Sequence, residues 1–139
     1  MLTEPQPATA FVTESLRPFE VTEGFKPGVQ LFQEGEEPRG IYFVHSGDVE
    51  LVYSSRTGSA KPLRRVEPGS FLGLSCVVSN RKHDCSATVR SEARIGMVPR
   101  EEFQRLLDER PDLWMTVLQI ISGDINSCWQ CMRSLNSKC

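Results

Sequence analysis

The sequence predicts a mainly β domain with flanking helices, and three observations carry that prediction. First, 139 residues suit one domain with a single hydrophobic core. Second, between Gly24 and Pro99 a Gly, Pro, Ser or Asn interrupts short β-branched and aromatic runs. Third, after Pro99 the apolar residues recur at the spacing of three and four that is typical of helices. Regularly spaced short strands indicate a sandwich, a barrel or a jelly roll.

The first fifteen residues are expected to form a flexible N-terminal arm. They contain Pro5, Pro7 and several small polar side chains. They have no basic start followed by an apolar run, so they do not resemble a signal peptide. We therefore expect the folded β domain to cover residues 16–110, and we expect a cytoplasmic address.

The clearest strand signal is "IYFVHSGDVELVY" (41–53), which contains two apolar runs around a Ser-Gly-Asp turn. We interpret it as a hairpin. In its second run Val49, Leu51 and Tyr53 alternate with other residues, which predicts one mainly buried face. Residues 54–62 are expected to form a polar loop. Two further strands are expected in "CSATVRS" (85–91) and "ARIGMVP" (93–99).

Two helices are expected after Pro99. The segment 100–110 places Phe103, Leu106 and Leu107 on one face, and Pro111 ends this helix. Residues 111–135 then carry an apolar stripe down a helix of roughly 36 Å at 1.5 Å per residue. Such a helix is longer than a domain of this size needs to cover its own sheet. We therefore expect part of its apolar stripe to pair two chains into a homodimer. The expected seam is Leu113, Val117, Ile121, Ile125, Cys128, Met132 and Leu135.

Two glycine-rich segments carry a resemblance to a known family. The segment "GVQLFQEGEEPRGIYFVHSGDVEL" (28–51) closely resembles the first signature of cyclic-nucleotide-binding domains, and "VEPGSFLGL" (66–74) resembles the second. The resemblance extends over residues 18–135 and is nearest to the sensor domains of Crp/Fnr transcription regulators. It implies a double-stranded β-roll (jelly roll) that is closed by helices and paired through its C-terminal helix. In that family a DNA-binding winged helix-turn-helix follows. The present sequence stops at Cys139, so we expect no DNA-binding domain in it.

The family's phosphate cradle is the candidate ligand site. A cradle needs close backbone N–H groups and a fixed cation, for which the fork of an arginine is suited. The family pattern is Gly-Glu, followed some ten residues later by Arg-Ser/Thr-Ala. In this sequence Leu74 stands in the place of the glutamate and Cys85 in the place of the arginine. The degenerate cradle consists of Gly73, Leu74, Ser75, Cys85, Ser86 and Ala87.

The loss of both anchors is expected to abolish ordinary cyclic-nucleotide binding. A charge-assisted contact is worth about 1.5–3 kcal/mol, so two of them account for roughly two to four decades of affinity. Arg81, Lys82 and His83 lie just before Cys85 and are the candidate substitutes for anion contact. One alternative is therefore a cAMP sensor with displaced anchors. A stand-alone protein-interaction module is another. We expect no cofactor.

Other classes of function find little support in the sequence. A net charge of −2 gives no electrostatic footprint for nucleic acid, and no stretch is long enough to span a membrane. Cys76, His83 and Cys85 lack a recognisable ligand spacing, so we expect no metal site. The five cysteines are expected to be free thiols, although a disulfide between two Cys128 residues is an alternative. No catalytic constellation is evident, and we expect His45 to be a structural or surface histidine.

Overall fold

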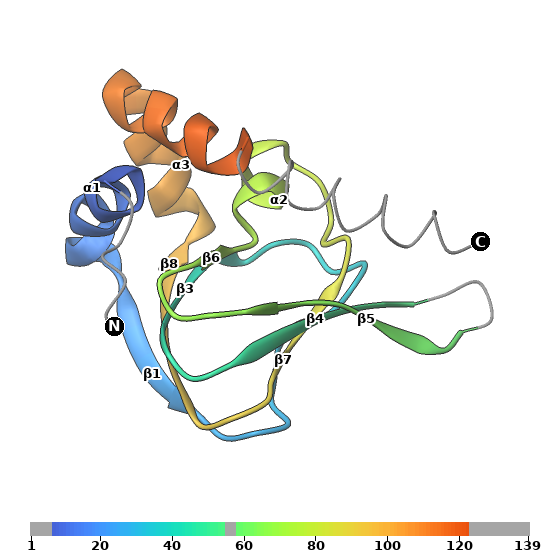
Figure 1. Cartoon of the computed structure of the whole chain (residues 1–139). Helices are drawn as coiled ribbons and strands as arrows, with labels where there is room; N and C mark the ends of the chain where they lie inside the picture. Colours follow the sequence, from blue (N-terminus) through green and yellow to red (C-terminus); the bar gives the residue numbers. More distant parts are fainter. Residues whose placement is uncertain (1–6, 55–57, 123–139) are drawn as a thin grey trace.

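The computed structural model describes residues 7–54 and 58–122. In this part of the chain, eight strands form two antiparallel four-stranded sheets (Figure 1). The orders are β1-β8-β3-β6 and β2-β7-β4-β5. The bounds are β1 Val21–Phe25, β2 Gln30–Phe32, β3 Gly40–Ser46, β4 Val49–Ser54, β5 Ala60–Val66, β6 Phe71–Leu72, β7 Ser86–Val89 and β8 Ala93–Pro99. The predicted β-roll with flanking helices is confirmed.

Both faces of β3 are buried, which explains its continuous apolar run. Ile41 and Phe43 pack in an outer apolar cluster beneath the helices. Tyr42 and Val44 point the other way, into a second cluster inside the roll. Because side chains alternate along a strand, one run of four apolar residues serves both cores.

The expected hairpin at residues 41–53 is wrong in its pairing. β3 pairs with β6 and β8, whereas β4 pairs with β5 and β7, so the two runs lie in different sheets. The turn between them is a corner, at which Gly47 has φ 89. A Cβ at Gly47 would lie 2.5 Å from the Cβ of Ala93. Alternation predicts which face of a strand is buried, but it does not identify the strand's partner.

The expected loop at 54–62 is shorter than predicted, because β5 begins at Ala60. Residues 55–57 lie outside the described part. In the β4–β5 pair, Leu51 faces Arg64 and Val52 faces Pro62, so Leu63 is an extra residue. This irregularity is a β-bulge, a feature that redirects neighbouring side chains.

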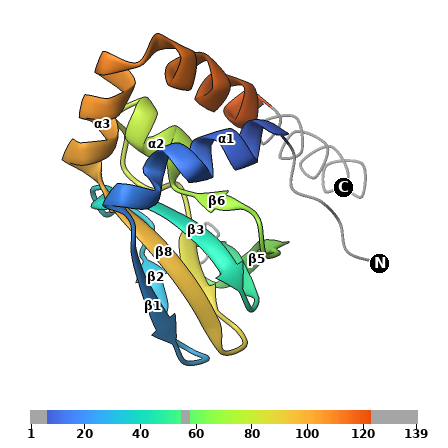
Figure 2. The ribbon, with the colours of Figure 1, turned by 90° about the vertical axis from the view of Figure 1, so that its left-hand side faces the viewer.

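The helices gather at one end of the roll (Figure 2). α1 spans Pro7–Leu16 and leads through the 3₁₀ turn Arg17–Phe19 into β1. α2 spans Leu74–Val78 and α3 spans Arg100–Glu109, and a further helix covers 111–122. The predicted helix after Pro99 is confirmed, with Phe103 and Leu106 buried.

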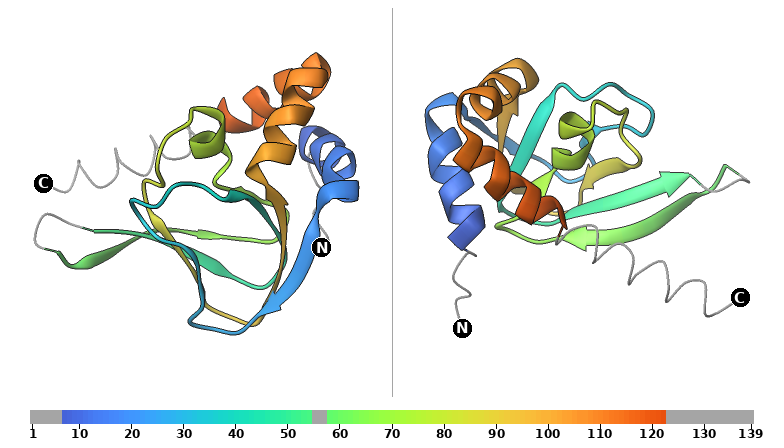
Figure 3. Two further views of the ribbon diagram at one scale, coloured as in Figure 1. Left: turned by 180° about the vertical axis from the view of Figure 1, so that it is seen from behind. Right: turned by 90° about the horizontal axis from the view of Figure 1, so that it is seen from above.

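The expected flexible arm over residues 1–15 is wrong from Pro7 onward. α1 forms there, and its Val12 and Leu16 are buried in the outer cluster. α1 runs beside the helix of 111–122 over the end of the roll (Figure 3, right). Residues 1–6 lie outside the described part. The sequence signal is weak because Val12 and Leu16 are the only buried residues among the described side chains of α1.

Three residues of the expected dimer seam pack inside their own chain instead. Leu113 and Val117 are fully buried and Ile121 is 8% exposed, all in the cluster that contains Val12 and Leu16. They therefore have no surface left for a second subunit. The physical reason is α1, which covers this face of the helix. The remaining seam residues, Ile125, Cys128, Met132 and Leu135, lie outside the described part.

Candidate functional site

The first half of the cradle is a left-handed turn that leads into a short helix. Gly73 has φ 78, a conformation that L-residues with a Cβ rarely adopt, and α2 begins at the next residue. Leu74 is 3% exposed and packs in the outer apolar cluster. At the position where the family has its glutamate, this chain therefore has a core residue. Ser75 is half-buried beside it.

The second half of the cradle lies at the start of β7. The Oγ of Ser86 accepts a hydrogen bond from the backbone N–H of Glu34 at 2.9 Å. Ala87 is fully buried, and Cys85 is half-buried against the inner cluster. The frame of the cradle is thus intact, and the two anchor positions hold a leucine and a thiol.

A cavity of about 150 Å³ opens between the two halves. It lies between β5, the start of α2 and the segment that precedes β7. Most of its wall is apolar. It is lined by Phe32, Leu51, Leu63, Arg64, Phe71, Leu72, Gly73, Leu74, Ser75, Cys76, His83, Asp84 and Cys85. The sequence-predicted cradle residues Gly73, Leu74, Ser75 and Cys85 therefore come together.

His83 is buried in the wall of this cavity. It is 3% exposed, and its ring stacks on Phe32 at 3.8 Å between centroids with an angle of 12° between the planes. Neither ring nitrogen has a hydrogen-bond partner. Burial lowers the pKa of His83, and the carboxylates of Glu36 and Asp84 oppose that shift. The ring is therefore held mainly neutral.

The other two expected substitute anchors do not reach the cavity. Arg81 forms an ion pair with Asp84 at 3.1 Å, and its side chain is 50% exposed. Its Nε donates to the Oγ of Ser79 at 3.0 Å. Lys82 is exposed and does not line the cavity. Of the three candidates, only His83 lies at the site.

The sequence reasoning missed Arg64, the only arginine or lysine among the described residues that line the cavity. It lies opposite Leu51, whose side chain faces the inside of the roll. Residues paired across an antiparallel sheet point to the same face, so Arg64 also points inward. Counting back two residues from the buried Val66 places Arg64 on the same inner face, but no strand is expected over residues 60–66 from the sequence.

Cys76 also lines the cavity, next to the cradle residues. Burial raises the pKa of the Cys76 thiol, which makes it a weak nucleophile. Within 7–54 and 58–122 there is no cluster of three His, Cys, Asp or Glu residues that could hold a metal.

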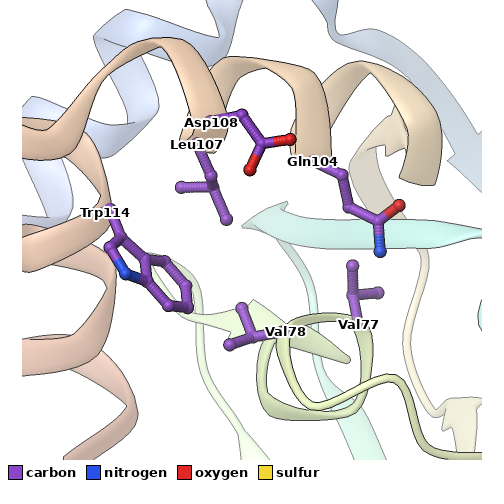
Figure 4. A pocket seen from close by; sticks show the side chains of 6 residues that line it. All are labelled: Val77, Val78, Gln104, Leu107, Asp108 and Trp114. Atoms are coloured by element: carbon purple, nitrogen blue, oxygen red, sulfur yellow. The ribbon is translucent and has the colours of Figure 1, made fainter.

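A groove of about 360 Å³ lies where α2 faces α3 and Trp114 (Figure 4). The indole of Trp114 points into it together with Leu107 and Val78.

His45 behaves as the sequence analysis expected of a structural histidine. It lies near the end of β3, and its Nε2 is 3.0 Å from a carboxylate oxygen of Glu20. The same oxygen accepts from the hydroxyl of Thr22 at 3.0 Å. Trp129, Cys128 and Cys131 lie outside the described part.

Comparison with known proteins assigns the family. The sequence profile of the cyclic nucleotide-binding domain matches residues 22–110, which include both halves of the cradle. The chain belongs to the cyclic nucleotide-binding domain family. The resemblance seen in the sequence is confirmed at this level. Among the described residues, no helix is long and apolar enough to cross a membrane.

The relatives of this cyclic nucleotide-binding domain are distant. It is 24% identical to the CRP-like cAMP-activated global transcriptional regulator of Mycobacterium tuberculosis over 115 residues, or 83% of this chain and 50% of the regulator. It is also 24% identical to the cAMP-dependent protein kinase regulatory subunit of Yarrowia lipolytica over 82 residues, or 59% of this chain and 21% of that protein. The chain thus spans at most half of these two proteins.

A solved structure shares the fold more completely. The c-di-GMP responsive global regulator CLP of Xanthomonas campestris superposes with a TM-score of 0.80 at 15% identity. The match covers 93% of this chain and 63% of that chain. At this identity the likeness is one of fold.

Proposed function

We propose that the chain is the sensory and dimerisation domain of a Crp/Fnr-type transcription regulator, and that it does not bind cAMP in the family's usual way. The observation that carries the second part is the cavity wall. Leu74 is a core residue and Cys85 is a half-buried thiol, so neither supplies a charged anchor. The cavity volume of about 150 Å³ is also about half of the roughly 300 Å³ at which ordinary ligand pockets begin.

An exposed apolar strip supports a regulatory domain that works as a dimer. The helix that begins at residue 111 leaves Met115 59% and Leu118 37% exposed on its outer face. Residues three apart share a face of a helix, so the two form one apolar strip. A sensor of this kind would act by shifting the relative orientation of two such helices between populated states. DNA would be a partner only through a helix-turn-helix elsewhere in the full protein.

The alternative of a cAMP sensor with displaced anchors receives less support. Arg81 is engaged with Asp84 at the surface, and Lys82 is exposed away from the cavity. A stand-alone interaction module would keep the roll and lose every ligand. The proposal differs from that module by retaining a ligand cavity with a buried, unpartnered histidine in its wall.

Calorimetric titration with cAMP and cGMP tests the proposed lack of nucleotide binding. The expected result is the absence of saturable binding in the micromolar range, because two charge-assisted contacts worth roughly two to four decades are missing. The Cys85→Arg variant is the matched control. It returns a guanidinium to the cavity wall and should bind cAMP more tightly than the natural chain. Micromolar binding by the natural chain would overturn the proposal.

A further inference from the structure

Arg64 supplies a cation to the cavity from the side opposite the family's cradle. Arg64 pairs with Leu51 in the regular register that runs from Val66, just before the β-bulge at Leu63, so its side chain points into the roll. Arg64 is half-buried and lines the cavity with Ser75 and Cys85. A guanidinium has five N–H donors, so it can receive a ligand carboxylate in addition to its contacts within the protein.

His83 supplies the second observation. Its ring is 3% exposed, lines the cavity, and has two buried nitrogen atoms without a hydrogen-bond partner. Native proteins rarely leave a buried polar group unsatisfied. A neutral imidazole carries one N–H, and a ligand oxygen in the cavity would accept its hydrogen bond.

The charges around the cavity suit a ligand with a single negative charge. Arg64 is the only cationic Arg or Lys side chain among the described lining residues, and Asp84 is the only carboxylate. Asp84 is already paired with Arg81 at 3.1 Å. A ligand with two negative charges would therefore face a single cationic side chain in the described wall. A carboxylate, in contrast, can form two parallel hydrogen bonds with one guanidinium.

The size and apolar wall of the cavity limit the rest of the ligand. Leu51, Leu63 and Phe71 contribute apolar surface, and the volume is about 150 Å³. A cavity of about 150 Å³ is known to accommodate benzene. The ligand body is therefore a short aliphatic chain or one aromatic ring, which is too small to be a nucleoside.

We propose that this cavity binds a small monocarboxylate, with the carboxylate held by Arg64 and by an N–H of His83 and the apolar body against Leu51, Leu63 and Phe71. The proposal rests on the proposed function, because it names the ligand class of the same sensory site. No covalent step is involved.

Calorimetric titration with benzoate and butyrate tests this proposal, and benzamide and butyramide serve as uncharged controls of similar shape. On the natural chain, each acid should bind about 10- to 100-fold more tightly than its amide, which corresponds to the loss of one charge-assisted contact. The comparison between acid and amide needs no variant, so it holds even if a substitution impairs folding.

Variants then assign the contacts. Arg64→Met should weaken benzoate binding about 10- to 100-fold, whereas Arg65→Met, at the exposed neighbouring position on β5, should leave it unchanged. His83→Phe keeps a ring to stack on Phe32 and removes both nitrogens, so it should weaken binding about 2- to 10-fold. Thermal unfolding of each variant confirms that it is folded.

The outcomes separate this proposal from the proposed function. Equal binding of acid and amide, no binding into the tens of millimolar, or equal effects of Arg64→Met and Arg65→Met would each overturn the monocarboxylate site. A parallel cAMP titration and the sedimentation of the chain report on the function itself. A chain that sediments as a dimer and binds neither cAMP nor benzoate would refute only the proposed ligand class. Micromolar cAMP binding would refute the proposed function.

Discussion

At the scale of residues, His83 determines the character of the cavity wall. Its ring and that of Phe32 form a stacked pair that lines two cavities, because both also border a second hollow of about 180 Å³. Glu36 and Tyr42 line that second hollow. The neutral ring packs among these groups, and a charged ring would have to be desolvated at a cost in free energy.

The pH dependence of stability follows from the lowered pKa of His83. Its ordinary pKa is 6.5, and burial lowers the pKa in the folded chain. As the pH falls below about 6.5, the unfolded chain therefore takes up this proton before the folded chain does. The free energy of unfolding decreases with falling pH until the pKa of His83 in the folded chain is reached. Urea unfolding at a series of pH values should show this loss between neutral and acidic pH.

One variant isolates this contribution. His83→Phe should lose less free energy of unfolding than the natural chain as the pH falls, because it has no titrating group at this position. If His83→Phe and the natural chain lost equal free energy over this range, the lowered pKa would not contribute to stability.

At the scale of elements, the helix of 111–122 has one apolar face that packs within the chain and one that is exposed. The inner face, with Leu113 and Val117, packs against Val12 and Leu16 of α1. The outer face carries Met115 and Leu118. The helix therefore completes the core of its own domain and leaves an apolar strip exposed, which is the surface proposed above for pairing with a second copy.

The two faces should respond differently to an introduced charge. Met115→Asp or Leu118→Asp should convert a dimer into a folded monomer, because the charge would lie in the seam. Val117→Asp should unfold the chain, because it buries an unpaired carboxylate at a fully buried position. Sedimentation and thermal unfolding together distinguish these results.

Val21→Asp is the matched control for this experiment. Val21 is 57% exposed on β1, similar to Met115, and its substitution should leave the assembly unchanged. A dimer that survives both Met115→Asp and Leu118→Asp would exclude the outer face of this helix as the seam.

The elements also show what the sequence could predict. Period-two and helical spacings predicted the strands at 85–91 and 93–99 and the helix after Pro99, because burial of one face leaves a regular pattern. The partner of a strand leaves no such pattern, so the sequence predicts a hairpin of β3 and β4 although the two strands lie in different sheets. α1 was missed because two buried residues four positions apart are too few to establish a period.

At the scale of the whole molecule, the roll and its ligand anchors are separable. The frame of the cradle depends on backbone geometry and core packing, as the left-handed Gly73 and the fully buried Ala87 illustrate. The frame forms in this chain with a leucine and a cysteine at the two anchor positions. The sequence therefore predicted the frame and the lost anchors. It did not predict Arg64, because no strand is expected over residues 60–66, where Pro62 interrupts the apolar pattern.

Residue-resolved NMR titration of the ¹⁵N-labelled chain tests the central claim most directly. The claim is that the cradle has lost its nucleotide anchors and takes a small carboxylate through Arg64 and His83. Benzoate should shift the backbone amide signals of Arg64, Gly73 and His83, and cAMP at the same concentration should leave them unchanged. Saturating shifts of these amides with cAMP, or benzoate shifts confined to residues outside the cavity, would contradict the claim.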